Sequence, residues 1–302
     1  MPRDDLKKRI EALNKKPLKN VPEAKQTAKP AVVTTERVAY SRSVPTLTAN
    51  PQPIQPSKSG KPVKLEDVVD GIITQAPVGP GYYLVEMPAT SLDACAGVMY
   101  EQFLRLTGYP DGTAVERLAR ACKSESIAPE EIIFMDLETT GLSMTPLFLI
   151  GTMEVTPDGL HFKQYFARDY SEEVSIITAY AERMRSARMV VTFNGKSFDV
   201  PFLSTRALAA GVKCPAPEFH LDLLHESRRI YKHDLPNCRL QTLEQMVCGR
   251  CREDDIPGAE IPQAYHDFVR SGDAGKIAQI LYHNLYDLLT MADLMHRMWH
   301  RD

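Results

Sequence analysis

The sequence lacks several features that define special classes of protein. No apolar run approaches the roughly 18 residues needed to cross a bilayer, so we expect no transmembrane helix and no membrane partner. Residues 1–19 are charged throughout and contain no apolar segment typical of a secretory signal, which predicts a cytoplasmic protein. No internal repeat is evident, so a repeat architecture is not expected.

Cysteine is also sparse, with six residues in a chain of 302. Without a secretory signal, these cysteines are better interpreted as reduced thiols than as a disulfide framework. Cys248 and Cys251 have CxxC spacing, and Cys238 and His233 lie nearby. A second well-spaced pair of ligands is missing, however, so the pattern does not predict a zinc site.

The charge of the chain is divided unevenly. Residues 1–63 contain 13 Lys and Arg against 5 Asp and Glu, a net charge of +8, together with 9 of the 22 prolines. This composition predicts a disordered, basic, Pro-rich arm, which either touches nucleic acid nonspecifically or only improves solubility. Residues 64–302 carry a net charge of −11, from 23 basic and 34 acidic residues, and have a globular composition.

Residues 64–128 form a small lead-in segment, in which 70–86 is rich in turns and β-formers and 100–122 is a helix broken by glycines. The pattern then changes over 129–302 to three strands followed by alternating helices and strands. This order predicts an α/β domain with a mixed five-stranded sheet flanked by helices. The expected strands are 131–137, 147–155, 160–167, 189–193 and 220–223; the expected helices are 172–186, 198–210, 242–247, 262–270 and 274–299.

Two carboxylates stand at the end of the first of these strands, in the sequence Ile-Ile-Phe-Met-Asp-Leu-Glu-Thr-Thr-Gly-Leu. Asp136 and Glu138 are two positions apart, so they project from the same face of the strand. Their mutual repulsion and lost hydration cost several kcal/mol unless something compensates. Mg²⁺ or Mn²⁺ suits such oxygen ligands, whereas an isolated pair of this kind more commonly just reaches solvent.

A third carboxylate, Asp199, follows a buried strand and an Asn-Gly turn and falls in the first turn of a helix. Capping is the routine role for such an Asp, but the end of a strand in an open α/β sheet is also the usual place for a site. A fourth, Asp287, lies on or beside the apolar stripe of the last helix, four residues after His283. A buried Asp on such a stripe needs a partner, which would be a metal ion if Asp287 faces the other carboxylates. The alternative is that His283 and Asp287 form an ordinary pair on the helix surface.

The sequence thus contains three patterns in order: two carboxylates on a strand, an Asp after an Asn-Gly turn, and a His and an Asp on the last helix. Together they resemble the motifs of DEDD-type 3′-5′ exonucleases of the RNase H-like superfamily. A closer resemblance, to the bacterial YprB family, covers roughly residues 65–300. It is carried by the segments 71–86, 220–229, 235–244, 252–258 and 260–262.

The resemblance implies hydrolysis of phosphodiester bonds with two Mg²⁺ or Mn²⁺ ions. Asp136 would bridge both ions, Glu138 and Asp287 would bind one, and Asp199 would bind the other. His283 would take a proton from the attacking water. The chain departs from the family's His-type branch in one respect. In that branch the His lies five positions before the last Asp, but here Tyr282 occupies that position, and His283 lies four positions before Asp287. We favour His283 as the base.

The resemblance also points to residues that would contact nucleic acid. Bound metal ions would reverse the acidic charge of the domain locally. His220 and Asp222 end a predicted strand next to the site, and two interpretations of them are open: support of the site or plain local structure. For the basic residues named below, a solvated charge is the alternative. The charge of the loop 252–255 favours a solvated turn, whereas the resemblance suggests that this loop shapes the substrate groove. The candidate substrate-binding residues are Thr139, Asn194, Lys196 and Phe198, with Arg206, Arg228 and Arg229 as weaker candidates for holding the phosphate backbone.

Two other functions fit the same fold. One is a catalytically silent nucleic-acid-binding or scaffold module, although such a protein would have no reason to keep five costly polar groups. The other is an endonuclease, because only the shape of the groove restricts the same metal chemistry to a strand end. The sequence leaves open DNA or RNA, single or double strand, protein partners and oligomeric state.

Overall fold

The computed structural model describes residues 62–108, 121–123, 127–252 and 255–299, and the fold concerns these residues. The predicted arm over 1–63 therefore lies outside the described residues except for its last two. The same holds for much of the predicted broken helix over 100–122.

A mixed seven-stranded sheet forms the centre of the described chain, in the order β1-β2-β5-β4-β3-β6-β7. The central strand β3 runs antiparallel to β4 and parallel to β6. β7 continues the sheet in parallel beyond β6, and β2 pairs antiparallel with β5 on the other side. The strands are β1 (Ile72–Thr74), β2 (Tyr82–Pro88), β3 (Ile132–Thr139), β4 (Leu147–Thr156), β5 (Gly159–Phe166), β6 (Met189–Thr192) and β7 (Phe219–Asp222).

The predicted α/β class is confirmed, and the five expected strands are present as β3 to β7. The sheet is wider than five strands because the β segment predicted over 70–86 forms β1 and β2, which extend the same sheet. β5 would otherwise leave a row of unpaired backbone groups at the edge of the sheet. The division of the chain at residue 128 stays a prediction, but the sheet is built from both sides of it.

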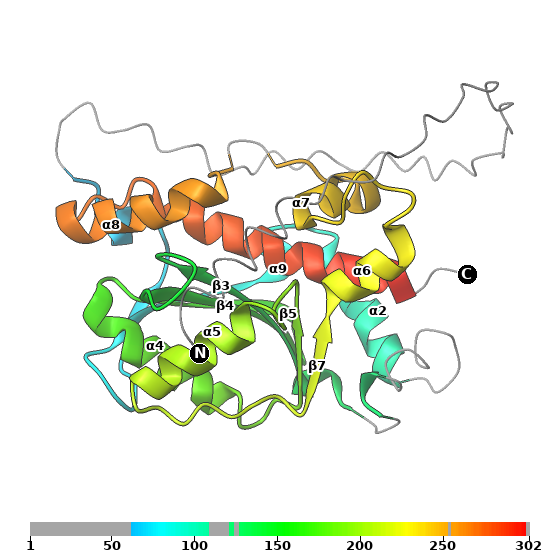
Figure 1. Ribbon diagram of the computed structural model, residues 1–302, viewed down its shortest axis with the longest axis horizontal. Coiled ribbons are helices and arrows are strands. Elements are labelled where there is room, and N and C mark those ends of the chain that lie inside the picture. Colours follow the sequence, from blue (N-terminus) through cyan, green and yellow to red (C-terminus); the bar gives the residue numbers. More distant parts are fainter. Residues whose placement is uncertain (1–61, 109–120, 124–126, 253–254, 300–302) are drawn as a thin grey trace, which may run out of the picture. The chain divides into compact units, whose positions relative to one another are not determined.

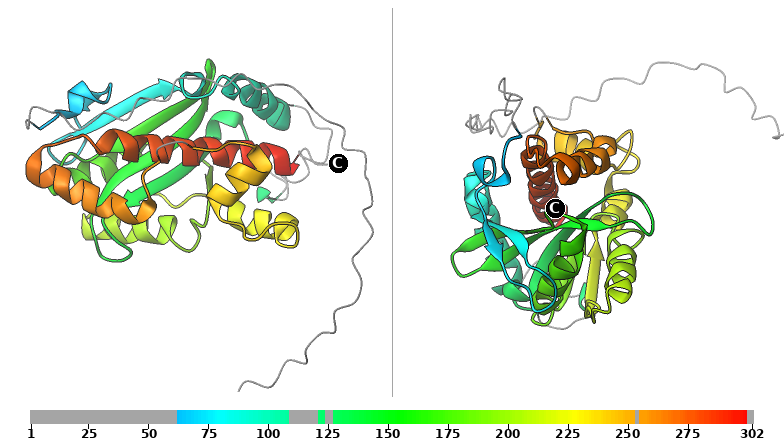
Figure 2. Two further views of the ribbon diagram at one scale, coloured as in Figure 1. Left: turned by 90° about the horizontal axis from the view of Figure 1, so that it is seen from above. Right: turned by 90° about the vertical axis from the view of Figure 1, so that its left-hand side faces the viewer.

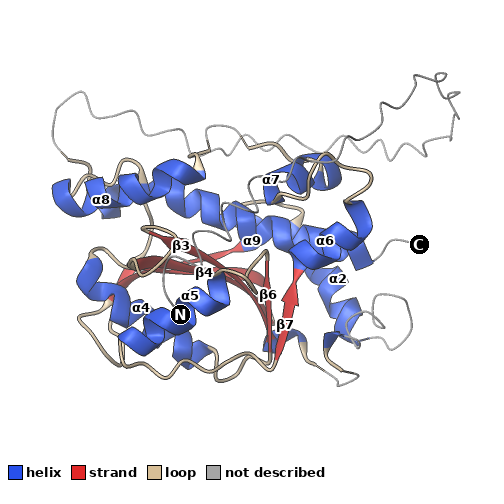
Figure 3. Ribbon diagram, viewed as in Figure 1, coloured by secondary structure: helices blue, strands red, loops and turns tan. Residues whose placement is uncertain are grey.

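Helices cover both faces of this sheet (Figure 1). α4 and α5 lie along one face, and α9 crosses the other, as the same view coloured by secondary structure also shows (Figure 3). α2 and α6 pack against α9. The helices are α2 (Ala96–Gly108), α4 (Glu173–Arg183), α5 (Asp199–Ala209), α6 (Leu223–Tyr231), α7 (Leu240–Leu243), α8 (Ile261–Ser271) and α9 (Ile277–Trp299). Short 3₁₀ turns span Leu65–Asp67, Ala89–Ser91, Pro129–Glu131, Tyr170–Glu172 and Gly258–Glu260.

The alternation of side chains along β3 decides which face carries its carboxylates. Ile132 and Phe134 are fully buried in the core cluster that includes the α9 residue Leu288, whereas Ile133 and Met135 belong to the cluster on the other face. Positions two residues apart share a face of a strand. Asp136 and Glu138 therefore project toward α9. Figure 2 shows α9 running along this face of the sheet.

The helix predicted over 242–247 begins earlier and changes its character. After α7, the turn Glu244–Cys248 is a π-helix, and Gly249 ends it with a left-handed backbone (φ 72°). A π turn is wider than an α turn and is frequent at functional sites. In the described part of the chain, no helix is long and apolar enough to cross a membrane.

Candidate functional site

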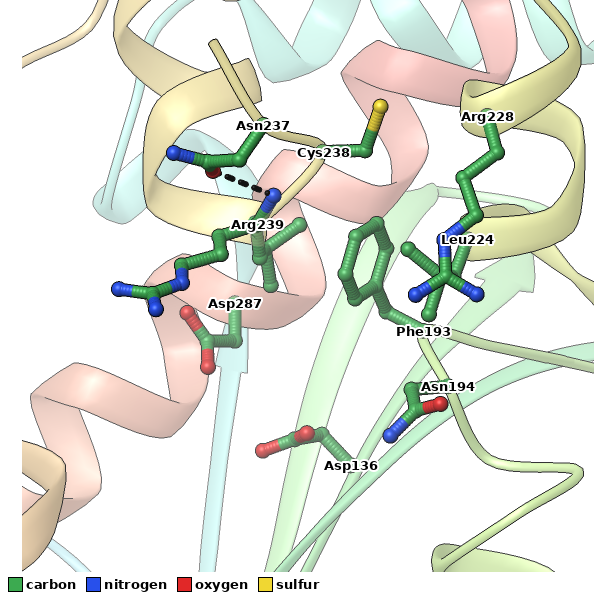
Figure 4. A pocket seen from close by; sticks show the side chains of 10 residues that line it. Asp136, Phe193, Asn194, Leu224, Arg228, Asn237, Cys238, Arg239 and Asp287 are labelled. Atoms are coloured by element: carbon green, nitrogen blue, oxygen red, sulfur yellow. Dashed lines mark hydrogen bonds between the residues drawn. The ribbon is translucent and has the colours of Figure 1, made fainter. Parts of the chain in front are cut away.

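The two carboxylates of β3 lie where this strand ends its regular pairing. Asp136 and Glu138 are half-buried, and the register between β3 and β4 shifts directly after Glu138. Asp136 and Asp287 of α9 line the same pocket (Figure 4). The first and last motifs of the sequence, about 150 residues apart along the chain, thus meet at one place.

Asp199 is the first residue of α5 and is buried. The turn before it depends on two unusual positions: Asn194 has a left-handed backbone (φ 67°), and a Cβ on Gly195 would lie 2.4 Å from the Thr192 hydroxyl. Asp222 fastens this turn, because its carboxylate accepts hydrogen bonds from the backbone N–H groups of Asn194 (2.9 Å) and Lys196 (3.0 Å). Asp222 therefore supports the position of Asp199, one of the two interpretations that the sequence left open.

His283 and Asp287 occupy successive turns of α9 and contact each other, with 3.5 Å between Nε2 of the imidazole and Oδ2 of the carboxylate. The other ring nitrogen, Nδ1, lies 2.8 Å from Oδ1 of Asp255, which the sequence did not single out. A carboxylate at one nitrogen fixes the ring and directs the other nitrogen. Tyr282 has different surroundings, because its hydroxyl donates to the hydroxyl of Tyr286.

Asn284, next to His283, holds Asp136 in place. Its amide nitrogen donates to Oδ2 of Asp136 (2.8 Å), and its amide oxygen accepts from Gln164 (2.8 Å). The side chain is fully buried and lies directly over β4, where a Cβ on Gly151 would approach its oxygen to 1.9 Å. Sequence reasoning missed this residue. The available signal was an amide in the middle of an apolar stripe, since a buried amide needs partners.

Arg252 is the second residue that sequence reasoning missed. Its guanidinium contacts the carboxylates of Glu244 (2.8 Å), Asp255 (3.5 Å) and Asp287, and it donates to the backbone carbonyl of His283 (3.2 Å). Only 5% of its side chain is exposed. The interpretation of 252–255 as a solvated turn was therefore wrong for Arg252. The rest of that run, 253–254, lies outside the described residues.

The carboxylates of the site perturb one another. Burial raises the pKa of Asp136 well above its usual range, and the charges of Asp287 and Glu138 raise it further. Burial likewise raises the pKa of Glu138 to about 8, although the charge of His283 opposes this. The pKa of Asp199 rises to about 7 because of burial, against hydrogen bonds from backbone N–H groups. The site therefore compensates these carboxylates too little to keep them ionised at their usual pKa.

The imidazole shows the complementary effect. Burial by itself lowers the pKa of His283, but the hydrogen bond to Asp255 and the charges of Asp287 and Glu138 outweigh it and raise the value to about 9. Without another cation in the site, His283 is therefore protonated at neutral pH and serves as one of the counter-charges.

The candidate residues have the ligand atoms that divalent cations prefer, but their side chains are not placed around a common position. Carboxylate oxygens are the ligands of Mg²⁺ and Mn²⁺, and added positive charge would relieve the repulsion that raises the pKa of Asp136 and Glu138. Within the described ranges, no three His, Cys, Asp or Glu side chains are placed to hold an ion as they stand. Arg252 engages Asp287 instead. Binding of a metal ion at Asp287 would thus require its carboxylate to turn or to be shared.

The raised pKa values predict how stability depends on pH. Asp199, Glu138 and His283 hold a proton more tightly in the folded than in the unfolded chain, so their contribution is complete below pH about 4 and is lost as the pH rises through about 7, 8 and 9. Between about pH 6 and pH 9, we expect the melting temperature in EDTA to fall by at least about 5 °C. Differential scanning fluorimetry would measure it.

Mn²⁺ binds deprotonated ligands, so it should raise the melting temperature more at about pH 9 than at about pH 6. Glu138→Gln is the control, because it should weaken the pH dependence of the melting temperature in EDTA and also that of the Mn²⁺ effect. A melting temperature that is constant or rises over this pH range in EDTA would contradict the assigned shifts.

The predicted substrate-binding residues have varied surroundings. Thr139 is buried, with its hydroxyl donating to the carbonyl of Gly141 (2.7 Å), whereas Asn194 and Lys196 are exposed and Phe198 is half-buried. Their roles stay predictions. His220 is hydrogen-bonded to Thr192 (2.9 Å). Two of the weaker candidates are ion-paired: Arg206 with Glu173 (2.7 Å) and Arg229 with Glu226.

The part of the chain that carries the candidate site matches known proteins. A family profile of the RNase H superfamily matches residues 133–299. YprB of Bacillus subtilis, described as an uncharacterized protein, is 31% identical over 182 residues, which cover 59% of this chain and 44% of YprB. The chain thus spans less than half of that relative.

Among solved structures, the family B DNA polymerase of the archaeon Pyrobaculum calidifontis is similar over 54% of this chain and 24% of the polymerase, with 17% identity and a TM-score of 0.44. This likeness is too distant to support any functional argument. The profile match covers more than half of the chain and includes β3, α5 and α9, which carry the four candidate carboxylates. The chain therefore belongs to the RNase H superfamily, whose fold is of the nuclease type, and it is similar to YprB.

Proposed function

We propose that this protein is a metal-dependent 3′-5′ exonuclease that hydrolyses phosphodiester bonds of DNA or RNA. The observation that carries the proposal is a group of acidic side chains from three elements beside one buried imidazole. Burial, together with the charge of Asp287, raises the pKa of Asp136, Glu138 and Asp199. Natural proteins keep such costly groups at functional sites. Membership of the RNase H superfamily supports a nuclease, and the resemblance of the motifs to DEDD enzymes supports cleavage from the 3′ end.

Each side chain has a defined task in this proposal. Two bound Mg²⁺ or Mn²⁺ ions would stabilise the charge on the attacking and leaving oxygens of the phosphate. Asp136 would contact both ions, Glu138 and Asp287 would hold one, and Asp199 would hold the other. The mutual effects of these carboxylates on their pKa values support a shared site.

Bound cations would oppose the protonation of His283, and the neutral ring would then accept the proton of the attacking water at Nε2. The contact of Nδ1 with Asp255 supports this assignment, because it fixes the ring and leaves Nε2 directed toward Asp287. The hydrogen bond of Tyr282 to Tyr286 argues against Tyr282 as the base.

A digestion time course tests the proposal. We expect 5′-labelled single strands of DNA or RNA to shorten stepwise in Mg²⁺ or Mn²⁺ and to stay intact in EDTA, with a matched duplex run in parallel. Circular single-stranded DNA should stay intact, because it has no end. Cleavage of the circle would identify an endonuclease. Binding without any cleavage, under either metal, would identify a catalytically silent module.

Two variants test the base within the same assay. His283→Ala should slow cleavage by about 100-fold or more, since that is the usual contribution of a positioned general base. Tyr282→Phe should leave the rate nearly unchanged. The reverse result would move the base to Tyr282.

A further inference from the structure

A pocket of about 520 Å³ opens beside the carboxylates (Figure 4). Asp136 and Asp287 line one side of it. Leu224 and Arg228 of α6 lie on the other side in this view, and the segment that leads into α7 lies above Asp287. Figure 4 shows Phe193 between these two sides. The lining is completed by Asn194, Leu224, Arg228, Asn237, Cys238, Arg239 and Leu240.

Two arginines of this pocket differ from the others in the chain. Among arginines whose side chains the structure describes, Arg228 and Arg239 have no recorded carboxylate partner, and both are exposed. The remaining ones each pair with Asp or Glu; they are Arg168, Arg183, Arg185, Arg188, Arg206, Arg229, Arg250, Arg252, Arg270 and Arg297. In a domain with a net charge of −11, the two unpaired guanidinium groups thus stand next to the site.

The chemistry of the two arginines indicates the kind of group that they bind. A guanidinium presents N–H donors in a planar fork that matches a phosphate or a carboxylate. A single carboxylate ligand would offer only one anionic group to the arginines and the metal ions together. A phosphodiester strand, in contrast, offers one phosphate to the arginines and the next to the carboxylates with their cations.

The wall between the arginines is apolar. Phe193 and Leu240 are half-buried and Leu224 is buried, so their exposed parts face the pocket rather than open solvent. Aromatic side chains bind unpaired bases by stacking, which requires the base to be free of its complementary strand. The volume lies in the range of sites for single small ligands rather than of grooves for a double helix.

We propose that this pocket binds one unpaired nucleotide of a single strand, with its base on Phe193 and its phosphates held by Arg228 and Arg239. The substrate class is then single-stranded nucleic acid, and the next phosphodiester along the strand lies at Asp136 and Asp287. This inference rests on the proposed function for the cutting step, but the binding can be measured without it.

Fluorescence anisotropy of the full chain tests this assignment. The probes are fluorescein-labelled oligo(dT), oligo(U) and a blunt-ended duplex, with Ca²⁺ in place of Mg²⁺ and with intact probe verified on a gel. We expect at least one of the single strands to bind about 10-fold or more tightly than the duplex. The comparison of oligo(dT) with oligo(U) identifies the preferred sugar.

Variants separate the phosphate contacts from stacking. Arg228→Gln and Arg239→Gln should each weaken binding about 10-fold, as expected for a charge-assisted hydrogen bond. Each should also reduce the slope of log K against log salt by about 0.7, the contribution of one phosphate contact on a single strand. Phe193→Leu keeps the packing but removes the aromatic ring, so it should weaken binding without changing this slope.

Arg185→Gln is the control, because Arg185 is also exposed but is paired with Glu182 (3.0 Å) and does not line the pocket. Equal binding of the duplex, or an unchanged salt slope in the double variant Arg228→Gln/Arg239→Gln, would overturn the inference. These failures differ from failure of the proposed function. Binding that depends on both arginines, in a protein that cuts nothing, would refute only the nuclease. Metal-dependent cutting with an unchanged salt slope would refute only the pocket.

Discussion

Asp136→Asn should lower the rate of phosphodiester cleavage by at least about 1,000-fold, because it removes the carboxylate proposed to contact both metal ions. The same substitution should raise the melting temperature in EDTA by roughly 2 to 5 °C. The reason for the gain is that burial, and then the charges of Asp287, Glu138 and Asp199, raise the pKa of Asp136, so its ionised form is disfavoured. An amide carries no charge and can still accept the hydrogen bond from Asn284.

Measurement of both quantities on one preparation makes this prediction specific. Mn²⁺ should raise the melting temperature of the wild type but have little effect on Asp136→Asn. Glu154→Gln is the control, since Glu154 is also buried but is paired with Arg183 (2.8 Å) and lies outside the site. It should lower stability and leave cleavage unchanged. An Asp136→Asn protein that is less stable than the wild type, or that still cuts, would refute the proposed role.

Arg252→Ala should have the largest effect on stability. Removal of the guanidinium leaves Glu244, Asp255 and Asp287 without their shared counter-charge in a position where only 5% of the arginine side chain is exposed. Breaking a buried ion pair from one side costs about 3 to 5 kcal/mol. Urea unfolding in EDTA, monitored by circular dichroism, would measure the loss of free energy of unfolding.

Metal ions distinguish this role from simple packing. Because the variant frees Asp287, Mn²⁺ should restore more stability to Arg252→Ala than it adds to the wild type. Arg270→Ala is a suitable control, since Arg270 is exposed and paired with Asp267, and such pairs contribute at most about 1 kcal/mol. A loss of the same size in both variants would refute the assigned role of Arg252.

Local pattern accounts for the parts of the fold that were predicted correctly. The apolar runs of β3 and β6 and the apolar stripe of α9 are patterns of residues close together in the sequence. The spacing of the apolar residues therefore predicts the type of each element and the face on which each carboxylate lies. Asp136 and Glu138 project from one face because side chains alternate along a strand. Asp199 begins a helix because it follows an Asn-Gly turn. The functional roles of these residues remain predictions.

Contacts between distant segments could not be predicted in this way. Nothing near Arg252 in the sequence indicates that it reaches Asp287 on α9, or that Asp255 reaches His283. The five strands of 129–302 do not reveal that β2 will pair with β5. Such contacts depend on where whole elements pack, not on local periodicity.

The sequence by itself determined the α/β class and the order of the strands along the chain. It also singled out four carboxylates and a histidine as a predicted site, since each of these follows from spacing within one element. Only the tertiary structure decided which polar groups compensate those carboxylates: Asn284 holds Asp136, and Arg252 holds Asp287. It also decided that Arg228 and Arg239 line a pocket beside them. The physical reason is that burial and charge compensation arise between segments brought together by folding.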